Sequence, residues 1–209
     1  MTPDLRLYLV TDTRLCGEVG VPETVSRAID GGVTLVQVRD PDAGDDQFLA
    51  LAREVVAIAK PRGVPVLLND RVHLVLAAGA QGAHVGQGDL PVAHARSLLP
   101  DGAVLGLSVT SSAELDEAAH LRPIIDYVGV GPVWAPQTKP DAAPPIGLVE
   151  LGRIAERSPW PAVAIGGIGI SNVGSIREAG CAGAAVVSAI CGTPDPGAAA
   201  ARLLEGWQR

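Results

Sequence analysis

The most informative part of the sequence is residues 33–68, which read VTLVQVRDPDAGDDQFLALAREVVAIAKPRGVPVLL. It begins and ends with short runs of β-branched and aliphatic residues, Val33 to Val38 and Val64 to Leu68. Between them, residues 46–60 carry apolar side chains at the three-to-four-residue spacing of a helix that buries one face. This order predicts a strand, a helix and a second strand that lies parallel to the first.

The same order recurs along the whole chain. Strands are expected at 5–10, 33–38, 64–68, 83–85, 104–109, 127–130, 162–165 and 184–190, and helices near 22–30, 46–60, 72–78, 92–98, 112–119, 147–156, 171–178 and 196–206. The strands are almost continuously apolar, as parallel strands covered on both faces are. We therefore expect an α/β fold, a single-domain (β/α)8 TIM barrel over residues 1–209. A flavodoxin-like doubly wound sheet is the alternative, but it normally has about five or six strands.

Two segments, 78–85 and 179–186, share the pattern A-G-x-x-G-A-x-V. In each, a glycine would end a helix before the chain turns into the next strand. The pattern relates the two halves of the predicted barrel, with chance similarity in an Ala- and Gly-rich chain as the alternative.

The composition excludes several classes of protein. With 47% hydrophobic and 19% charged residues, the chain has enough apolar side chain for a folded core. A net charge of −7 and 3% aromatic residues provide neither a basic face nor a stacking platform, so no nucleic-acid partner is expected. No apolar run reaches the length of a membrane span and no secretion signal is evident, so we expect no membrane partner and a cytoplasmic location. The three cysteines lack metal-ligand spacing and are expected to be buried, reduced thiols.

Polar side chains follow most of the predicted strands, and in a barrel these positions meet at the mouth where catalytic groups lie. They are Gln37, Arg39, Asp40, Asn69, Asp70, Arg71, Gln87, Asp89, Ser108, Thr110, Gln137, Thr138, Lys139 and Ser188. Alternation places Gln37 and Arg39 on one face of their strand. A guanidinium at the top of an apolar barrel needs an anionic partner. We expect a bound oxyanion, with a structural Asp as the alternative.

Asp70 and Asp89 follow two neighbouring strands, and Asn69 precedes Asp70. Each carboxylate alone is explained as the cap of the next helix. Together they are the kind of pair that holds Mg²⁺ when the ion also binds substrate phosphates. The sequence therefore favours a hard cation such as Mg²⁺ as the cofactor, with two helix caps as the alternative.

Residues 131–146 form a Pro-rich connection with no helical pattern, so we expect an active-site loop there. Lys139 in this loop is expected to contact a phosphate, with a solvated lysine as the alternative. Gly166 and Gly167 after the seventh strand, and Ser188 after the eighth, lie where many barrels bind phosphate. The histidines show no metal-ligand spacing, and none is a strong candidate for a general base.

Seven segments, in order and at matching spacing, resemble the thiamine-phosphate synthase family over essentially the whole chain. They are Gln37-Val38-Arg39-Asp40, Leu68-Asn69-Asp70, HVGQGDL at 84–90, Gly106-Leu107-Ser108, Gly129-Val130-Gly131-Pro132 through Thr138-Lys139, Ile165-Gly166-Gly167-Ile168 and Val187-Ser188-Ala189-Ile190. That family joins 4-amino-5-hydroxymethyl-2-methylpyrimidine diphosphate to a thiazole phosphate, and it releases thiamine phosphate and pyrophosphate. The resemblance implies a Mg²⁺-dependent transferase of thiamine biosynthesis that acts on these two small molecules.

The resemblance also implies roles for single residues. The pyrimidine diphosphate would be bound by Gln37, Arg39, Asn69, Ser108 and Lys139, of which Arg39, Ser108 and Lys139 are catalytic. Val38, Asp40 and Pro41 would also belong to the substrate-binding segment. Mg²⁺ would be held by Asp70 and Asp89, and the thiazole phosphate by Pro136, Gln137, Thr138, Gly167, Val187 and Ser188. In the implied path the diphosphate leaves first, which gives a pyrimidine methyl cation that the thiazole nitrogen then attacks. This path needs no protein nucleophile. A homo-oligomer is left open.

Two positions depart from the family pattern. Pro41 stands where the family usually has the lysine of Gln-x-Arg-x-Lys, and Pro136 stands where it usually has the first threonine of Pro-Thr-x-Thr-Lys. Each lost contact to a charged phosphate is worth about 1.5–3 kcal/mol. We therefore expect weakened diphosphate binding, with Arg71 as a candidate substitute for the missing charge.

Two further functions remain open at this point. A related thiazole tautomerase has the same fold but uses a histidine near the end of the fifth strand, where this chain reads Ser108-Val109-Thr110. The other is a catalytically silent protein that binds thiazole or thiamine phosphates. Pro41 and Pro136 favour it, whereas Asp70, Asp89 and Lys139 argue against it.

Overall fold

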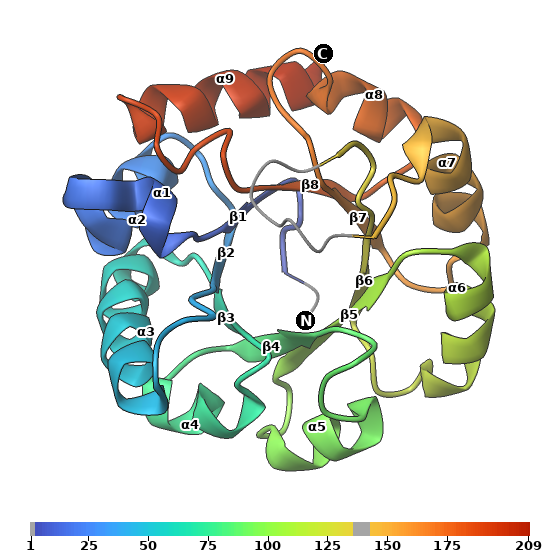
Figure 1. Cartoon of the computed structure of the whole chain (residues 1–209), viewed down its shortest axis with the longest axis horizontal. Helices are drawn as coiled ribbons and strands as arrows, with labels where there is room; N and C mark the ends of the chain where they lie inside the picture. The colour runs from blue at the N-terminus through green and yellow to red at the C-terminus, as the bar shows by residue number, and fades with distance from the viewer. Residues whose placement is uncertain (1–2, 136–142) are drawn as a thin grey trace.

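The computed structural model describes residues 3–135 and 143–209. Within these residues, parallel strands pair in sequence order from β1 to β8, and β8 pairs with β1 to close a barrel (Figure 1). The strands are β1 Leu7–Val10, β2 Leu35–Val38, β3 Val66–Asn69, β4 Gly82–Val85, β5 Val104–Val109, β6 Tyr127–Val130, β7 Ala162–Ile165 and β8 Gly183–Val186. The predicted single-domain (β/α)8 barrel is confirmed.

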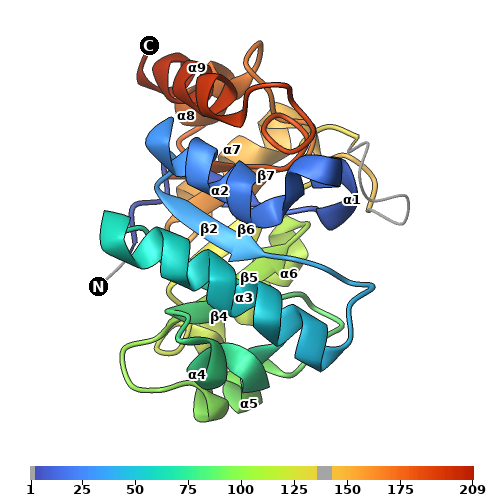
Figure 2. The ribbon, with the colours of Figure 1, turned by 90° about the vertical axis from the view of Figure 1, so that its left-hand side faces the viewer.

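Helices surround the barrel in the order of the chain (Figure 1). The α-helices are α1 Thr13–Cys16, α2 Gly20–Asp30, α3 Asp45–Ala59, α4 Val75–Ala78, α5 Val92–Leu98, α6 Ser112–Ala118, α7 Gly147–Arg157, α8 Val173–Glu178 and α9 Pro196–Gln208. Short 3-10 turns are η1 Gly17–Val19, η2 Lys60–Arg62, η3 Val72–Leu74 and η4 Ala119–Leu121. Because the strands are parallel, the loops that follow them lie at one end of the barrel, and residues 3–6, which lead into β1, lie toward the other (Figure 2).

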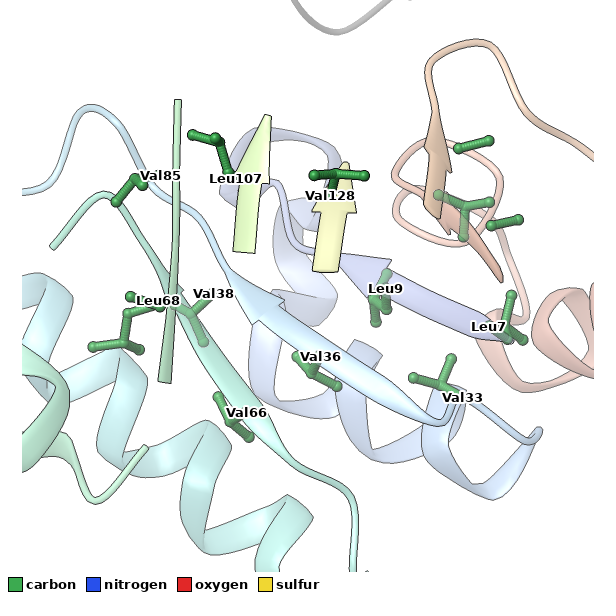
Figure 3. Packing of buried hydrophobic residues seen from close by; sticks show 14 of the residues in the cluster. Leu7, Leu9, Val33, Val36, Val38, Val66, Leu68, Val85, Leu107 and Val128 are labelled. Atoms are coloured by element: carbon green, nitrogen blue, oxygen red, sulfur yellow. The ribbon is translucent and has the colours of Figure 1, made fainter. Parts of the chain in front are cut away.

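Apolar side chains fill two layers, one on each side of the strands. The outer layer lies between strands and helices, and Figure 3 shows part of it, including Leu9, Val36, Leu68 and Leu107. The inner layer fills the barrel with residues such as Leu35, Leu67, Val104 and Val163, together with Tyr8 and Tyr127. Burial on both faces explains why the strands are continuously apolar rather than alternating.

The eighth strand is shorter than predicted, because it ends at Val186 and not at Ile190. The chain turns at Val187, whose carbonyl oxygen accepts from the N–H groups of Ile190 at 3.1 Å and Cys191 at 2.8 Å. The apolar run continues past the strand because Ile190 and Cys191 are buried in the outer layer. Apolar residues occur both in buried loops and in buried strands, so a short apolar run does not distinguish the two.

The start of the first helical segment also differs from prediction. Helix α2 begins at Gly20, and the unpredicted helix α1 precedes it. Asp12 caps α1 by accepting from the N–H of Leu15 at 3.0 Å. A helix of one turn has too few residues to show a period, so the cap was its only sequence signal.

The repeated pattern corresponds to equivalent turns. Gly79 ends α4 with φ 70°, and Gly180, with φ 86°, lies just after α8. In both places the chain enters the next strand three residues later, at Gly82 in β4 and Gly183 in β8. The left-handed backbone favours glycine at both turns, as the pattern predicts.

All three cysteines are buried and free, as expected. No helix in the described part of the chain is both long and apolar enough to cross a membrane.

Candidate active site

A cavity of about 690 Å³ opens at the end of the barrel where the strands stop. Side chains and backbone from all eight strands or the loops after them line it. Among the described residues, Arg39 is the one arginine or lysine in its wall. The cavity is therefore suited to an anionic small molecule, which agrees with the predicted position of the site.

The structure brings seven of the predicted site residues together around this cavity. They are Gln37, Arg39, Asn69, Ser108, Gly167, Val187 and Ser188. Five others are not in its wall: Val38 packs in the outer apolar layer, Asp40 accepts from the Thr13 hydroxyl at 2.8 Å, Pro41 is exposed in the loop after β2, and Asp70 and Asp89 form the pair described below. Pro136, Gln137, Thr138 and Lys139 lie outside the described residues, so their roles remain predictions.

The backbone of Arg39 is held by the hydroxyl group of Thr11. Its N–H donates to Thr11 Oγ1 at 2.9 Å, and that hydroxyl donates to the Arg39 carbonyl oxygen at 3.3 Å. Thr11 is buried, with 1% of its surface exposed. The ion pairs among the described residues do not include Arg39. No structural Asp within the described chain therefore occupies the guanidinium, which leaves it for an anionic ligand.

Asp70 and Asp89 lie close to each other in the loops after β3 and β4, and neither is part of the cavity wall, although Asn69, next to Asp70, is. Partial burial of the Asp70 carboxyl group, together with the hydrogen bond and charge of Asp89, raises the pKa of Asp70 to about 7. Asp70 Oδ2 accepts from Asn69 Nδ2, and Asp89 Oδ2 accepts from the N–H of Gly86 at 2.7 Å. The charge of Arg39 acts on Asp70 in the opposite direction but does not cancel the rise, so the pair can still accept a cation.

The alternative that these two residues cap helices is wrong. Helix α5 begins after Pro91, with no side-chain cap, so Asp89 has no helix N–H to satisfy. The turn η3 begins after Arg71, again without a side-chain cap. Asp70 itself has φ 59°, a left-handed backbone that is uncommon for a residue other than glycine and that often marks a functional position.

Arg71 does not point to the site, contrary to the expectation that it replaces a missing charge. Its guanidinium pairs with Asp45, donates to the Ala43 carbonyl oxygen, and stacks on Phe48 with 4.6 Å from Cζ to the ring centroid. It is absent from the cavity wall. Arg71 instead ties the loop after β2 to the loop after β3, because Ala43 and Asp45 follow one strand and Arg71 the other.

The base of the 131–146 loop is fastened to the loop after β7. The N–H groups of Val133 and Trp134 donate to the carbonyl oxygens of Ile165 and Gly166 at 2.9 and 3.1 Å. A Cβ atom at Gly167, whose φ is 65°, would lie 2.6 Å from Trp134 Cβ. The glycine therefore lets the two loops approach closely, and Trp134, Ala135 and Ala143 border the cavity.

Tyr8, Tyr127 and His84 also line the cavity, although the sequence pattern did not single them out. Burial lowers the pKa of His84 to about 4, so the imidazole is neutral near pH 7. Its Nδ1 lies 2.8 Å from Tyr127 Oη and its Nε2 lies 2.9 Å from Ser108 Oγ. With both nitrogens engaged, His84 has none free to act as a base on a ligand, as the sequence analysis expected of the histidines. A polar residue inside an apolar strand was the available signal.

Comparison with known proteins places this cavity in a family. The family described as thiamine monophosphate synthase matches residues 7–190. The chain belongs to the thiamine monophosphate synthase family. The matched segment runs from the start of β1 to the turn after β8 and includes every residue of the cavity wall.

Members of this family are similar to the chain over nearly their whole length. A thiamine-phosphate synthase from Psychrobacter sp. (strain PRwf-1) is 48% identical over 201 residues, which cover 96% of this chain and 94% of that protein. One from Azorhizobium caulinodans is 46% identical, with 96% and 93% covered. The solved thiamine phosphate pyrophosphorylase from Pyrococcus furiosus is 32% identical, with a TM-score of 0.87 and with 98% and 96% of the two chains covered.

Proposed function

We propose that the chain is an enzyme that joins 4-amino-5-hydroxymethyl-2-methylpyrimidine diphosphate to 4-methyl-5-(2-hydroxyethyl)thiazole phosphate. The products are thiamine phosphate and pyrophosphate. The observation that carries the proposal is a family cavity in whose wall Arg39 makes no ion pair with any of the described residues. Both substrates are anions, and one of them leaves a diphosphate behind.

In this reaction the C–O bond to the diphosphate breaks, and the bonding electron pair leaves with the diphosphate. The lone pair of the thiazole nitrogen then forms the new C–N bond. Negative charge grows on the leaving group, and the Arg39 guanidinium, held in place by Thr11, stabilises it. No protein nucleophile is needed, which agrees with a site whose histidine is neutral and already hydrogen-bonded.

Mg²⁺ is the cofactor that we propose, and the residues present fit it. Asp70 and Asp89 supply two facing carboxylates, and Mg²⁺ typically takes one or two of these plus water and substrate phosphate oxygens. In the described part of the chain no group of three or more His, Cys, Asp or Glu side chains is placed to hold a metal, so the remaining ligands would be water and substrate. The ion supplies positive charge that neutralises the diphosphate.

The thiazole phosphate is assigned to the opposite side of the mouth, at Gly167, Val187 and Ser188. These residues follow β7 and β8, where phosphate sites of barrels are common. The loop over 131–146, whose base borders the cavity, is assigned the exclusion of water from the cationic intermediate. Lys139 remains a predicted phosphate contact.

The test is to incubate the purified protein with both substrates and Mg²⁺ and to measure thiamine phosphate and pyrophosphate. Both products should form in equal amounts, and they should disappear with Asp70→Ala or after removal of the metal. Absence of product, together with intact binding of thiazole phosphate, would overturn the proposal in favour of a silent binding protein. Isomerisation of a thiazole precursor without condensation would favour the tautomerase.

A further inference from the structure

A chain of hydrogen bonds crosses the interior of the barrel and joins two residues of the site. Gln37 Nε2 donates to Tyr8 Oη at 2.6 Å, and Tyr8 Oη lies 2.9 Å from Tyr127 Oη. Tyr127 Oη lies 2.8 Å from His84 Nδ1, and His84 Nε2 lies 2.9 Å from Ser108 Oγ. We call these five residues the tyrosine–histidine chain. It connects Gln37 on β2 to Ser108 on β5 through residues of β1, β6 and β4.

The protein reserves space for this chain. A Cβ atom at Gly106 would lie 2.3 Å from Tyr127 Cζ and 2.4 Å from His84 Nδ1, and one at Gly129 would lie 2.9 Å from His84 Cε1. Tyr8 and Tyr127, the two tyrosines of the sequence, are 2% and 0% exposed. Five polar side chains in a row inside a barrel are costly unless each hydrogen bond is made.

The chemistry of the links gives the chain one direction. Both phenols are buried, so each keeps its single proton. The two ring nitrogens of the buried His84 both face hydroxyl groups and neither faces a carboxylate, so the imidazole carries one N–H. Since Tyr8 accepts from Gln37, its proton goes to Tyr127 when every oxygen in the row donates once and accepts once. Tyr127 then donates to His84 Nδ1, and His84 Nε2–H donates to Ser108 Oγ.

This direction fixes what the two ends offer to a ligand. Ser108 Oγ already accepts from His84, so its own proton is free and it acts as a donor toward the cavity. Gln37 has turned its amino group to Tyr8, so its carbonyl oxygen is free as an acceptor. Reversal of every bond in the row would exchange the two roles together. The ends therefore cannot change independently.

We propose that Tyr8, Tyr127 and His84 are positioning residues that couple the amide orientation of Gln37 to the donor role of Ser108. The inference rests on the proposed function, since it concerns how the same site presents itself to the pyrimidine diphosphate. It adds three residues that act through Gln37 and Ser108 and leaves the contacts of the thiazole phosphate untouched.

The first experiment measures the His84 tautomer by ¹⁵N NMR in the substrate-free protein at pH 7.5, with His84→Asn to assign the signals. The expected result is a single tautomer, with Nε2 protonated and Nδ1 bare. In Tyr127→Phe, which keeps the ring and removes the donor to Nδ1, the tautomer should become mixed. A protonated Nδ1 or a mixture in the wild-type protein would overturn the inference.

The second experiment measures both KM values in Tyr8→Phe and Tyr127→Phe. In each variant the KM for the pyrimidine diphosphate should rise about tenfold, which corresponds to the loss of one hydrogen bond to this substrate. The KM for the thiazole phosphate should stay unchanged. Ser158→Ala is the matched control, because it removes a half-buried hydroxyl bond to the Trp160 carbonyl oxygen before β7, at the other end of the barrel. It should lower stability and leave both KM values alone.

Two phenylalanine variants are used because, if one of them fails to fold, the other still tests the same hydrogen-bond chain. Equal changes in both KM values, or no change in either, would show a merely structural role and overturn the inference. If the wild-type protein makes no thiamine phosphate, the proposed function fails, and the NMR result still tests the direction of the chain. If it is active but has the other tautomer, the inference alone fails.

Discussion

Thr11 and Arg39 are joined by two hydrogen bonds, because the Thr11 hydroxyl accepts from the Arg39 N–H at 2.9 Å and donates to its carbonyl oxygen at 3.3 Å. This pair fixes the backbone of β2 just past its last residue, Val38, where Arg39 turns into the cavity. The hydroxyl group of Thr11, the residue that follows β1, thus fixes the backbone position from which the Arg39 side chain extends.

Thr11→Val should therefore weaken the site as well as the fold. It removes both bonds and leaves a buried N–H without a partner, which costs about 1–3 kcal/mol of unfolding free energy. The KM for the pyrimidine diphosphate should rise several-fold because Arg39 is no longer held. Thr11→Ser keeps the hydroxyl and is the control. Denaturant unfolding and steady-state kinetics measure the two effects, and an unchanged KM in Thr11→Val would contradict the positioning.

Pro41 and Arg71 give a paired prediction about the missing positive charge. Pro41→Lys should lower the KM for the pyrimidine diphosphate by about tenfold, because a charge-assisted hydrogen bond to phosphate is restored. Arg71→Met should mainly destabilise the protein, by about 1–3 kcal/mol, because it breaks the pair with Asp45 and the stacking on Phe48. A large rise of this KM in Arg71→Met, with stability unchanged, would show that Arg71 supplies charge to the site after all.

The fold was predictable because its signal is repeated along the chain. Each strand is buried on both faces, so Val36 and Leu67 alike are apolar although one faces the helices and the other the barrel interior. The predicted element boundaries were wrong where the apolar pattern does not reflect secondary structure. Ile190 is apolar because it is packed under a loop, and Asp12 begins a helix too short to show periodicity.

The site was predictable only where a residue's type and its place at a strand end coincide. Gln37, Arg39 and Ser108 met both conditions. Tyr127 did not, because it begins β6 instead of ending it. His84 holds the same place in β4 as Gln37 does in β2, and it was set aside because the histidines show no metal-ligand spacing. The hydrogen bonds of His84, to Tyr127 on β6 and to Ser108 on the neighbouring β5, cannot be read from a sequence. Arg71 met both conditions and was still misassigned, since its partners Asp45 and Phe48 lie on a helix that is distant in sequence.

Removal of one carboxylate from the facing pair should separate stability from activity. Asp70→Asn relieves the repulsion between Asp70 and Asp89 and should stabilise the metal-free protein at pH 8 by about 1 kcal/mol, a value kept small because exposed charges are screened. It should also abolish condensation.

Thermal unfolding with and without Mg²⁺ measures this effect. Mg²⁺ should raise the Tm of the wild-type protein and leave that of Asp70→Asn unchanged. Asp101→Asn, at an exposed turn between α5 and β5, is the control and should behave as the wild type. Equal stabilisation of wild type and Asp70→Asn by Mg²⁺ would place the ion elsewhere.

His84 should make the protein less stable in mild acid. Its pKa is 6.5 in the unfolded chain and is lowered to about 4 by burial in the fold. Above pH 6.5 the imidazole is neutral in both states and has no effect on the pH dependence. As the pH falls from 6.5 toward 4, the unfolded chain takes up a proton that the folded protein refuses, so up to about 3 kcal/mol of stability is lost. Asp70 acts with the opposite sign, because its pKa is raised in the fold and its protonation below pH 7 favours the folded state.

The measurement is therefore made in an Asp70→Asn background, by urea unfolding between pH 7.5 and 4.5, with and without His84→Asn. The difference in unfolding free energy between the two proteins should shrink steadily as the pH falls. A difference that stays constant over this range would mean that His84 takes up its proton with the same pKa in the folded and the unfolded protein, and a difference that grows as the pH falls would mean that the folded protein holds the proton more tightly. Either result would contradict the burial of a neutral imidazole in the hydrogen-bond chain.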